Sequence, residues 1–371
     1  MTNADLGWLT NQVLWASFLV SMAFGALVQR TGFCTMGAVS DVMTMGDWTR
    51  MRQWGLAAGV ATLGFGALAW AGLISPDKTL YSSSRFLWLS ALVGGAIFGF
   101  GMVLSSGCAS KALVRIGGGS LKALVVTVVL GVAAFATLKG LTAVWRTATV
   151  DRIAPDFGMS ANLSIWAARA TSIEAPLAGL LAALVVGGAL VAWAIAGRDF
   201  VRGHNLLAGV GVGATVVAMW WVSGHMGYLP EHPETLQETF VATNSTRAEA
   251  LSFVAPIAYA LDWLMFYSDS NKRLTVGIVS VFGVIAGSAV VALAQRSFRW
   301  EGFSSTEDLA HHLAGAVLMG VGGVTAMGCS IGQGVSGVST LSATSFVAVA
   351  AMVGGAVASL KYQMWRVERS A

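Results

Sequence analysis

Three cysteines follow glycine-rich apolar stretches of the chain, and thiols placed in this way can bind or transfer sulfur compounds. Cys108 and Cys329 close the same pattern, Gly-x-Gly-x5-Gly-Cys, 221 positions apart (329 − 108). Cys34 has a partial version, because Gly25 stands nine residues before it and Gly32 closes the approach. None belongs to a C-x-x-C pair, which argues against a zinc site, an iron–sulfur cluster or a disulfide scaffold. We therefore expect three free thiols, with no metal and no other cofactor.

The composition places these cysteines in a membrane. The chain has 371 residues, of which 56% are hydrophobic and only 11% charged, far below the charged share of a soluble domain. Runs near the spanning length of about 20 residues occur roughly at 11–29, 54–74, 86–106, 120–137, 176–196, 205–222, 250–267, 274–294, 312–328 and 344–360. We predict an all-α polytopic protein that contacts membrane lipid, with a single transmembrane transport domain over 1–371.

The distribution of charge sets an expected orientation. Basic residues, 22 against 18 acidic ones, sit in short loops between the spans, which indicates orientation in the membrane rather than binding of nucleic acid. Arg30 is the first positive residue, so we expect no removable signal peptide. The tail carries Lys361 and Arg366, which favours a C terminus on the cytoplasmic side of the membrane, with the N terminus outside.

These ends require an odd number of crossings. The weakest run, 250–267, contains Pro256 and Asp262, and removing it leaves about nine transmembrane helices. Lys272 and Arg273 then fall outside, against the rule that positive residues stay inside. The two glycine-cysteine helices then run in opposite directions, so the chain would contain an inverted repeat with halves at approximately 11–137 and 205–360. If all ten runs crossed, the repeats would be parallel.

The hydrophobic pattern breaks after the repeated cysteines. Gly117-Gly118-Gly119 follows Cys108, and glycines with small hydroxyl residues follow Cys329. This pattern predicts short re-entrant half-helices, which survive at membrane depth only when they are buried in protein or line a cavity. A helix N-terminus favours anions through its unpaired N–H groups and its partial positive charge. A polarisable thiol beside it suits an anion with a soft, sulfur-containing end.

The candidate substrate-binding or pore residues are the three thiols with their immediate neighbours. They are Cys34, Cys108, Cys329, Gly32, Gly107, Gly328, Ser106, Ser330, Lys111 and Gln333. The glycines deeper in the helices, such as Gly101, are interpreted as packing residues. We expect alanine at Gly107 or Gly328 to obstruct the turn or the pore, and Gly101→Ala to be milder. Lys111 is interpreted either as attracting the anion or as an interfacial anchor.

A resemblance to a known family rests on three blocks around these cysteines. The blocks are Arg30-Thr-Gly-Phe-Cys34-Thr-Met-Gly, Ser106-Gly-Cys108-Ala-Ser-Lys111 and Met327-Gly-Cys329-Ser-Ile-Gly-Gln333. They resemble those of the YeeE/YedE family of sulfur-transport membrane proteins, and the resemblance covers nearly the whole chain. It implies uptake of thiosulfate across a bacterial inner membrane through a pore marked by Cys34, Cys108 and Cys329. It also implies a TusA-like sulfur-carrier protein as a separate cytoplasmic partner.

Two alternatives remain beside a transporter or channel for thiosulfate. A membrane thiol enzyme would use a cysteine of low pKa on a disulfide or on sulfane sulfur, and only Lys111 near Cys108 offers an activating cation. A transporter for another sulfur or selenium compound is the second alternative, because longer members of the family have selenium-related roles. No G-x-x-x-x-G-K-[ST] motif is found, which argues against direct use of ATP.

Overall fold

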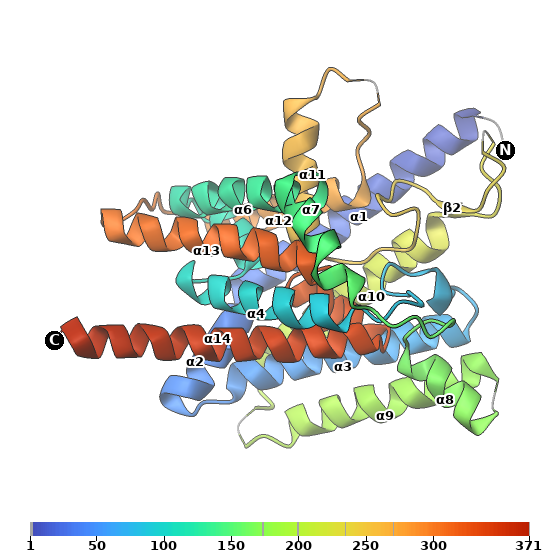
Figure 1. The fold of residues 1–371 in the computed structure, drawn as a ribbon, viewed down its shortest axis with the longest axis horizontal. Coiled ribbons are helices and arrows are strands. Elements are labelled where there is room, and N and C mark those ends of the chain that lie inside the picture. The colour runs from blue at the N-terminus through green and yellow to red at the C-terminus, as the bar shows by residue number, and fades with distance from the viewer. Residues whose placement is uncertain (1–2, 173, 199, 234, 270, 371) are drawn as a thin grey trace.

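Long helices dominate the fold and run roughly alongside one another, with the two chain ends at opposite ends of the bundle (Figure 1). The computed structural model describes residues 3–172, 174–198, 200–233, 235–269 and 271–370. The α-helices are α1 Asn3–Thr31, α2 Thr35–Met45, α3 Thr49–Trp70, α4 Trp88–Leu104, α5 Ala109–Gly117, α6 Leu121–Lys139, α7 Leu141–Ala148, α8 Leu163–Thr171, α9 Ala175–Ile195, α10 Gly203–Trp221, α11 Val254–Met265, α12 Val276–Ala294, α13 Thr306–Thr325 and α14 Ala343–Ser370.

Shorter elements connect or interrupt these helices. Two 3₁₀ turns, η1 at Pro76–Lys78 and η2 at Val150–Arg152, lie in connections. Two π-helical segments are η3, Val222–Met226, and η4, Gly332–Gly337. The two-residue strands β1, Tyr228–Leu229, and β2, Thr239–Phe240, pair antiparallel.

The prediction of an all-α polytopic membrane protein is confirmed. Among the described residues, seven helical segments are long and apolar enough to cross a membrane: Asp5–Met45, Trp88–Gly117, Leu121–Lys139, Ala175–Ile195, Gly203–Met226, Val276–Ala294 and Ala343–Arg369. Helices α3 and α13, of 22 and 20 residues, pack among them. Helix α11 has 12 residues, about 18 Å of helix, against about 30 Å of hydrocarbon. The weakest run in the sequence therefore does not reach spanning length.

Close backbone packing fixes the relative directions of the two glycine-cysteine helices. A Cβ atom built on Gly101 of α4 would lie 2.7 Å from the carbonyl oxygen of Gly315 in α13. Farther back along α4, Gly94 meets Gly322, and the Ser105 hydroxyl donates to the His312 carbonyl at 3.2 Å. Positions increase along α4 as they decrease along α13, so the two helices are antiparallel. The deep glycines are packing residues, as the sequence indicates.

The remaining helices complete two faces of the bundle. Helix α1 runs parallel to α12, because Phe18 and Met22 meet Gly283 and Gly287 in that order. Their first residues share one end of the bundle, called here the N-terminal face. The loop after Cys108 and the end of α14 lie at the opposite end, called the C-terminal face, where Arg366 pairs with Glu307 of α13 (Figure 1).

Candidate functional site

Each cysteine begins a short helix through the same backbone turn. Two residues before each thiol the backbone is left-handed, with φ of +67° at Gly32, +55° at Ser106 and +58° at Met327. Cys34 is the N-cap of α2 and Cys108 that of α5, both in extended conformation. After Cys329, residues 330–339 are helical and include η4. The predicted short half-helices are therefore present.

The backbone hydrogen bonds of the second and third turns match one another. Gly107 donates to the Met102 carbonyl at 2.9 Å, and Gly328 donates to the Gly323 carbonyl at 2.8 Å. These bonds cap the preceding helix in the manner of a Schellman motif, in which the left-handed residue stands one position earlier. The left-handed backbone conformation is therefore required at Ser106 and Met327. The sequence had suggested instead that the turn depends on Gly107 and Gly328. Both are non-glycine residues held in a strained region.

The thiols lie against helix N-termini and are largely enclosed. The Cys34 sulfur accepts from the Gly37 N–H and the Cys329 sulfur from the Gly332 N–H, both at 3.4 Å. The Cys108 sulfur lies 3.2 Å from the Ser110 hydroxyl oxygen. Cys108 and Cys329 are 2% and 0% exposed, while Cys34 is half-buried. All three are free thiols.

Cys108 lies close enough to the other two cysteines to interact electrostatically with both Cys34 and Cys329. Lys111 interacts with both Cys34 and Cys108. Among the described residues its ammonium group has no hydrogen bond and no ion pair. The structure thus brings Lys111 together with two of the three cysteines, without a counter-ion that neutralises it.

A vestibule opens on the N-terminal face and reaches the residue before Cys329. A cavity of about 200 Å³ is lined by Met327 and Gly328 at its inner end and by Glu249 and Tyr259 in its walls. It shares Asn244 and Tyr259 with an adjoining cavity of about 320 Å³. That outer cavity is lined by Lys139, Lys272, Arg273 and Asp262. Lys272 pairs with Asp262, whereas Lys139 and Arg273 have no ion pair within the described part of the chain.

The matching position on the C-terminal face is closed. A cavity of about 10 Å³ lies beside Gly107 and is lined by Arg115, Lys122 and His312. That volume holds about one water molecule. Arg115 donates to the Ser106 carbonyl at 3.2 Å, and Lys122 pairs with Asp308 at 2.8 Å. The surroundings of the two repeated turns therefore differ, since the cavity beside Gly328 is open and the cavity beside Gly107 is nearly closed.

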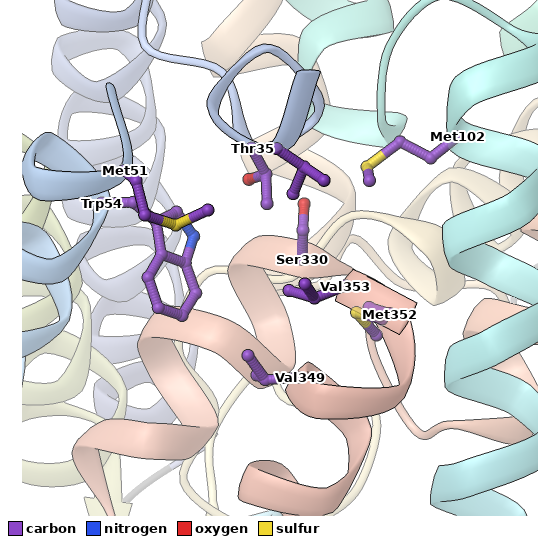
Figure 2. A pocket seen from close by; sticks show the side chains of 9 residues that line it. Thr35, Met51, Trp54, Met102, Ser330, Val349, Met352 and Val353 are labelled. Carbon is purple, nitrogen blue, oxygen red and sulfur yellow. The ribbon is translucent and has the colours of Figure 1, made fainter. Parts of the chain in front are cut away.

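A fourth cavity lies between the helices that Cys34 and Cys329 begin (Figure 2). It is lined by Thr35 and Ser330, each the residue directly after a cysteine. The cavities thus reach an immediate neighbour of every thiol: Thr35, Gly107, Gly328 or Ser330. Sequence reasoning found Ser330 but missed Thr35, although both follow a cysteine and that shared position was a usable signal.

Gln333 has a structural task in this arrangement. Its side-chain amide donates to the Ala326 carbonyl at 2.6 Å, and its amide oxygen accepts from the Ser345 hydroxyl at 2.6 Å. The side chain is 1% exposed. Gln333 therefore ties the end of α13 and the start of α14 to the helix after Cys329. Among the described residues, no group of three or more His, Cys, Asp or Glu side chains is placed to hold a metal ion.

Comparison with known proteins identifies the family. Residues 30–358 match the family described as sulphur transport, which is most of the chain. The chain belongs to this family. It is 26% identical over 339 residues to the thiosulfate transporter TsuA of Escherichia coli K12, covering 87% of this chain and 86% of that protein. It is 25% identical over 341 residues to the thiosulfate transporter TsuA of Spirochaeta thermophila, covering 91% and 94%.

A shorter match involves a second kind of relative. The probable transporter YedE of Escherichia coli K12 is 29% identical over 108 residues, which cover 28% of this chain and 25% of that protein. The resemblance found in the cysteine blocks is thus confirmed at the level of the family. Membership of a sulphur-transport family and a set of membrane-spanning helices together make the chain a multi-pass protein of sulfur-compound transport.

Proposed function

We propose that this protein carries thiosulfate inward across the bacterial cytoplasmic membrane along a path marked by Cys329, Cys108 and Cys34. The observation that carries the proposal is that each thiol stands at the start of a short helix inside the bundle. Full-length similarity to two proteins named thiosulfate transporters supports the choice of substrate.

The chemistry of the thiols suits thiosulfate. Thiosulfate has a hard end of oxygen atoms and a soft terminal sulfur, and it carries two negative charges. Helix N-termini supply N–H donors and positive potential for the oxygen atoms, while a thiol offers a weak donor and a polarisable surface for the sulfur. Several moderate sites in a row pass an ion on faster than one tight site. Three similar thiol sites therefore favour conduction over retention.

The two faces indicate a direction. We place the N-terminal face outside and the C terminus in the cytoplasm, so that the open vestibule collects the ion and the closed side by Gly107 releases it. Antiparallel packing of α4 and α13 supports inverted repeat halves at approximately 11–137 and 205–360. The basic residues Lys139, Lys272 and Arg273 then line the entrance. Positive residues on the outer side depart from the positive-inside rule, and we explain this by their role in attracting the anion to the entrance.

The membrane potential opposes this transport. Moving a dianion inward against about 100 mV costs roughly 4.6 kcal/mol, which holds the internal concentration about 2,000-fold below the external one. Entry must therefore be coupled to removal of the ion or to protons. We favour consumption at the exit by a TusA-like sulfur carrier. Four ionisable side chains in or beside the spans could carry protons instead: Asp41, Glu174, His311 and His312. Two of them form pairs within the protein, Asp41 with Arg50 and His312 with Asp308.

A membrane thiol enzyme is the second candidate, and one contact favours it. Lys111 interacts with Cys34 and Cys108 and can stabilise a thiolate. Transport is preferred because Cys108 and Cys329 are almost fully buried, so that a protein or disulfide substrate has no approach to them.

The test is uptake of radiolabelled thiosulfate by lipid vesicles that contain the purified protein. We expect uptake above that of empty vesicles, reduced by a membrane-permeant thiol-alkylating reagent. Addition of a TusA-like protein with a sulfur acceptor inside the vesicles should raise net accumulation. Uptake equal to that of empty vesicles would refute transport of thiosulfate. Strong accumulation driven by a pH gradient alone would refute consumption at the exit.

A further inference from the structure

We infer that the small cavity between Cys34 and Cys329 is a substrate-selecting chamber. It binds the oxygen atoms of thiosulfate through three neutral donors, and it binds the terminal sulfur of thiosulfate through methionines. The inference rests on the proposed function and assigns the point at which the ion is distinguished from sulfate. The chamber has a volume of about 30 Å³, room for about two water molecules. Figure 2 shows Ser330 with its hydroxyl pointing toward Thr35 across the gap.

Three polar groups that line the chamber lack partners. The hydroxyls of Thr35 and Ser330 and the indole N–H of Trp54 are buried and have no hydrogen-bond partner among the described residues. Thr35 is 9% exposed and Ser330 is 2% exposed. Buried polar groups are normally paired, because an unpaired one costs free energy. Three orphan donors on residues that line one cavity therefore make it a candidate site for a ligand that accepts hydrogen bonds once the wall opens.

Two helix starts strengthen the case for an anion. Thr35 is the first residue of α2, which has 11 residues, and Ser330 begins the helical stretch 330–339. Two helices from different parts of the fold thus start at residues that line the chamber, and the start of a helix carries a partial positive charge. No charged side chain lines the chamber. An anion is therefore attracted by dipoles alone, which lets it leave again.

The rest of the wall is soft and apolar. Met51, Met102 and Met352 come from α3, α4 and α14, and all three line the cavity. Figure 2 shows their side chains on different sides of the two hydroxyls. Thioethers are polarisable and their side chains adapt in shape, so they can move apart to admit an ion larger than the resting cavity. Sulfate has an oxygen atom where thiosulfate has sulfur, and that oxygen would face these thioethers without a donor.

The experiment uses the full-length protein in vesicles and Ser330→Ala as the principal variant. The control is Ser17→Ala in α1, because Ser17 is also buried and unpartnered but belongs to a helix that contributes no residue to the chamber. Both substitutions remove an orphan hydroxyl, so neither should lower the melting temperature in detergent. We expect Ser330→Ala to lose about tenfold or more in the initial rate of thiosulfate uptake. Ser17→Ala should transport like the wild type.

Two further measurements test the chemistry of the chamber. Thiosulfate, but not sulfate, should raise the melting temperature of the wild-type protein and of Ser17→Ala, and Ser330→Ala should lose this shift. Met352→Leu keeps the volume but removes a sulfur atom, and should let excess sulfate compete with thiosulfate more strongly. If Ser330→Ala transports like Ser17→Ala, the chamber does not select the substrate, even though the wild type transports thiosulfate. If the wild type fails to transport it, the proposed function itself is wrong.

Discussion

Replacing Gly101 by alanine tests the antiparallel contact that positions the two repeated cysteines. A Cβ atom at Gly101 would lie 2.7 Å from the Gly315 carbonyl oxygen, 2.8 Å from Leu318 Cβ and 2.9 Å from the Met319 nitrogen. Two of these atoms are backbone and the third is fixed to it, so α13 must move as a whole. Overpacking of this kind costs about 3 kcal/mol, and alanine regains about 1 kcal/mol in helix propensity.

Gly107→Ala is the matched comparison. A Cβ atom there would meet only the side chain of Lys111, at 3.3 and 3.4 Å, and Gly107 does not have a left-handed backbone. We expect Gly101→Ala to lose about 2 kcal/mol of stability and Gly107→Ala to change it by less than about 0.5 kcal/mol. The expectation from the sequence that Gly101→Ala is the milder change concerned uptake, whereas the contact in the structure makes it the more damaging change for stability.

The assay is thermal unfolding of both variants in the same detergent, together with their uptake of thiosulfate after reconstitution. A melting temperature of Gly101→Ala equal to that of the wild type would refute the tight contact between α4 and α13. If Gly107→Ala keeps its stability but loses uptake, the side chain obstructs the path, as the sequence suggested.

Three other changes test neighbouring parts of the account. Gln333→Leu leaves the Ala326 carbonyl and the Ser345 hydroxyl unpaired, so it should lose about 2 to 6 kcal/mol of stability; lost uptake at unchanged melting temperature would instead make Gln333 a substrate ligand. Burial raises the pKa of Glu249 in the vestibule. As pH falls, its carboxylate should therefore lose its negative charge at a higher pH than an ordinary glutamate does, and so repel the anion less. Uptake should rise accordingly, and Glu249→Gln should remove that rise. Arg273→Gln should raise the KM for thiosulfate several-fold at low salt with little change in kcat, and an unchanged KM would exclude capture at this residue.

Much of the fold follows from composition and spacing. Apolar runs of spanning length identified the long helices, and the run at 250–267 was correctly judged weak, because Pro256 and Asp262 interrupt its apolar character. Short helices after the repeated cysteines were also predicted, although the structure breaks the chain directly before Cys108 and Cys329 rather than after them.

The site is less accessible to sequence reasoning. The left-handed positions at Ser106 and Met327 carry side chains that normally avoid that conformation, so no glycine marks them. The sequence did not mark the methionines or Trp54 of the chamber as candidate site residues. Their convergence depends on the packing of α3, α4 and α14 around two half-helices, and nothing in their local sequence encodes that contact.

The central claim is that thiosulfate moves past the thiols, and the most direct test is the initial rate of uptake for Cys329→Ala in vesicles matched for protein amount. Cys329 is fully buried directly after Gly328, which lines the vestibule, and the hydrogen bond that its sulfur accepts from the Gly332 N–H is long, at 3.4 Å. The account predicts that this variant melts close to the wild type, yet takes up thiosulfate at a small fraction of the wild-type rate. Wild-type uptake by a variant that unfolds at much lower temperature would show that the thiol is a packing residue and contradict the account.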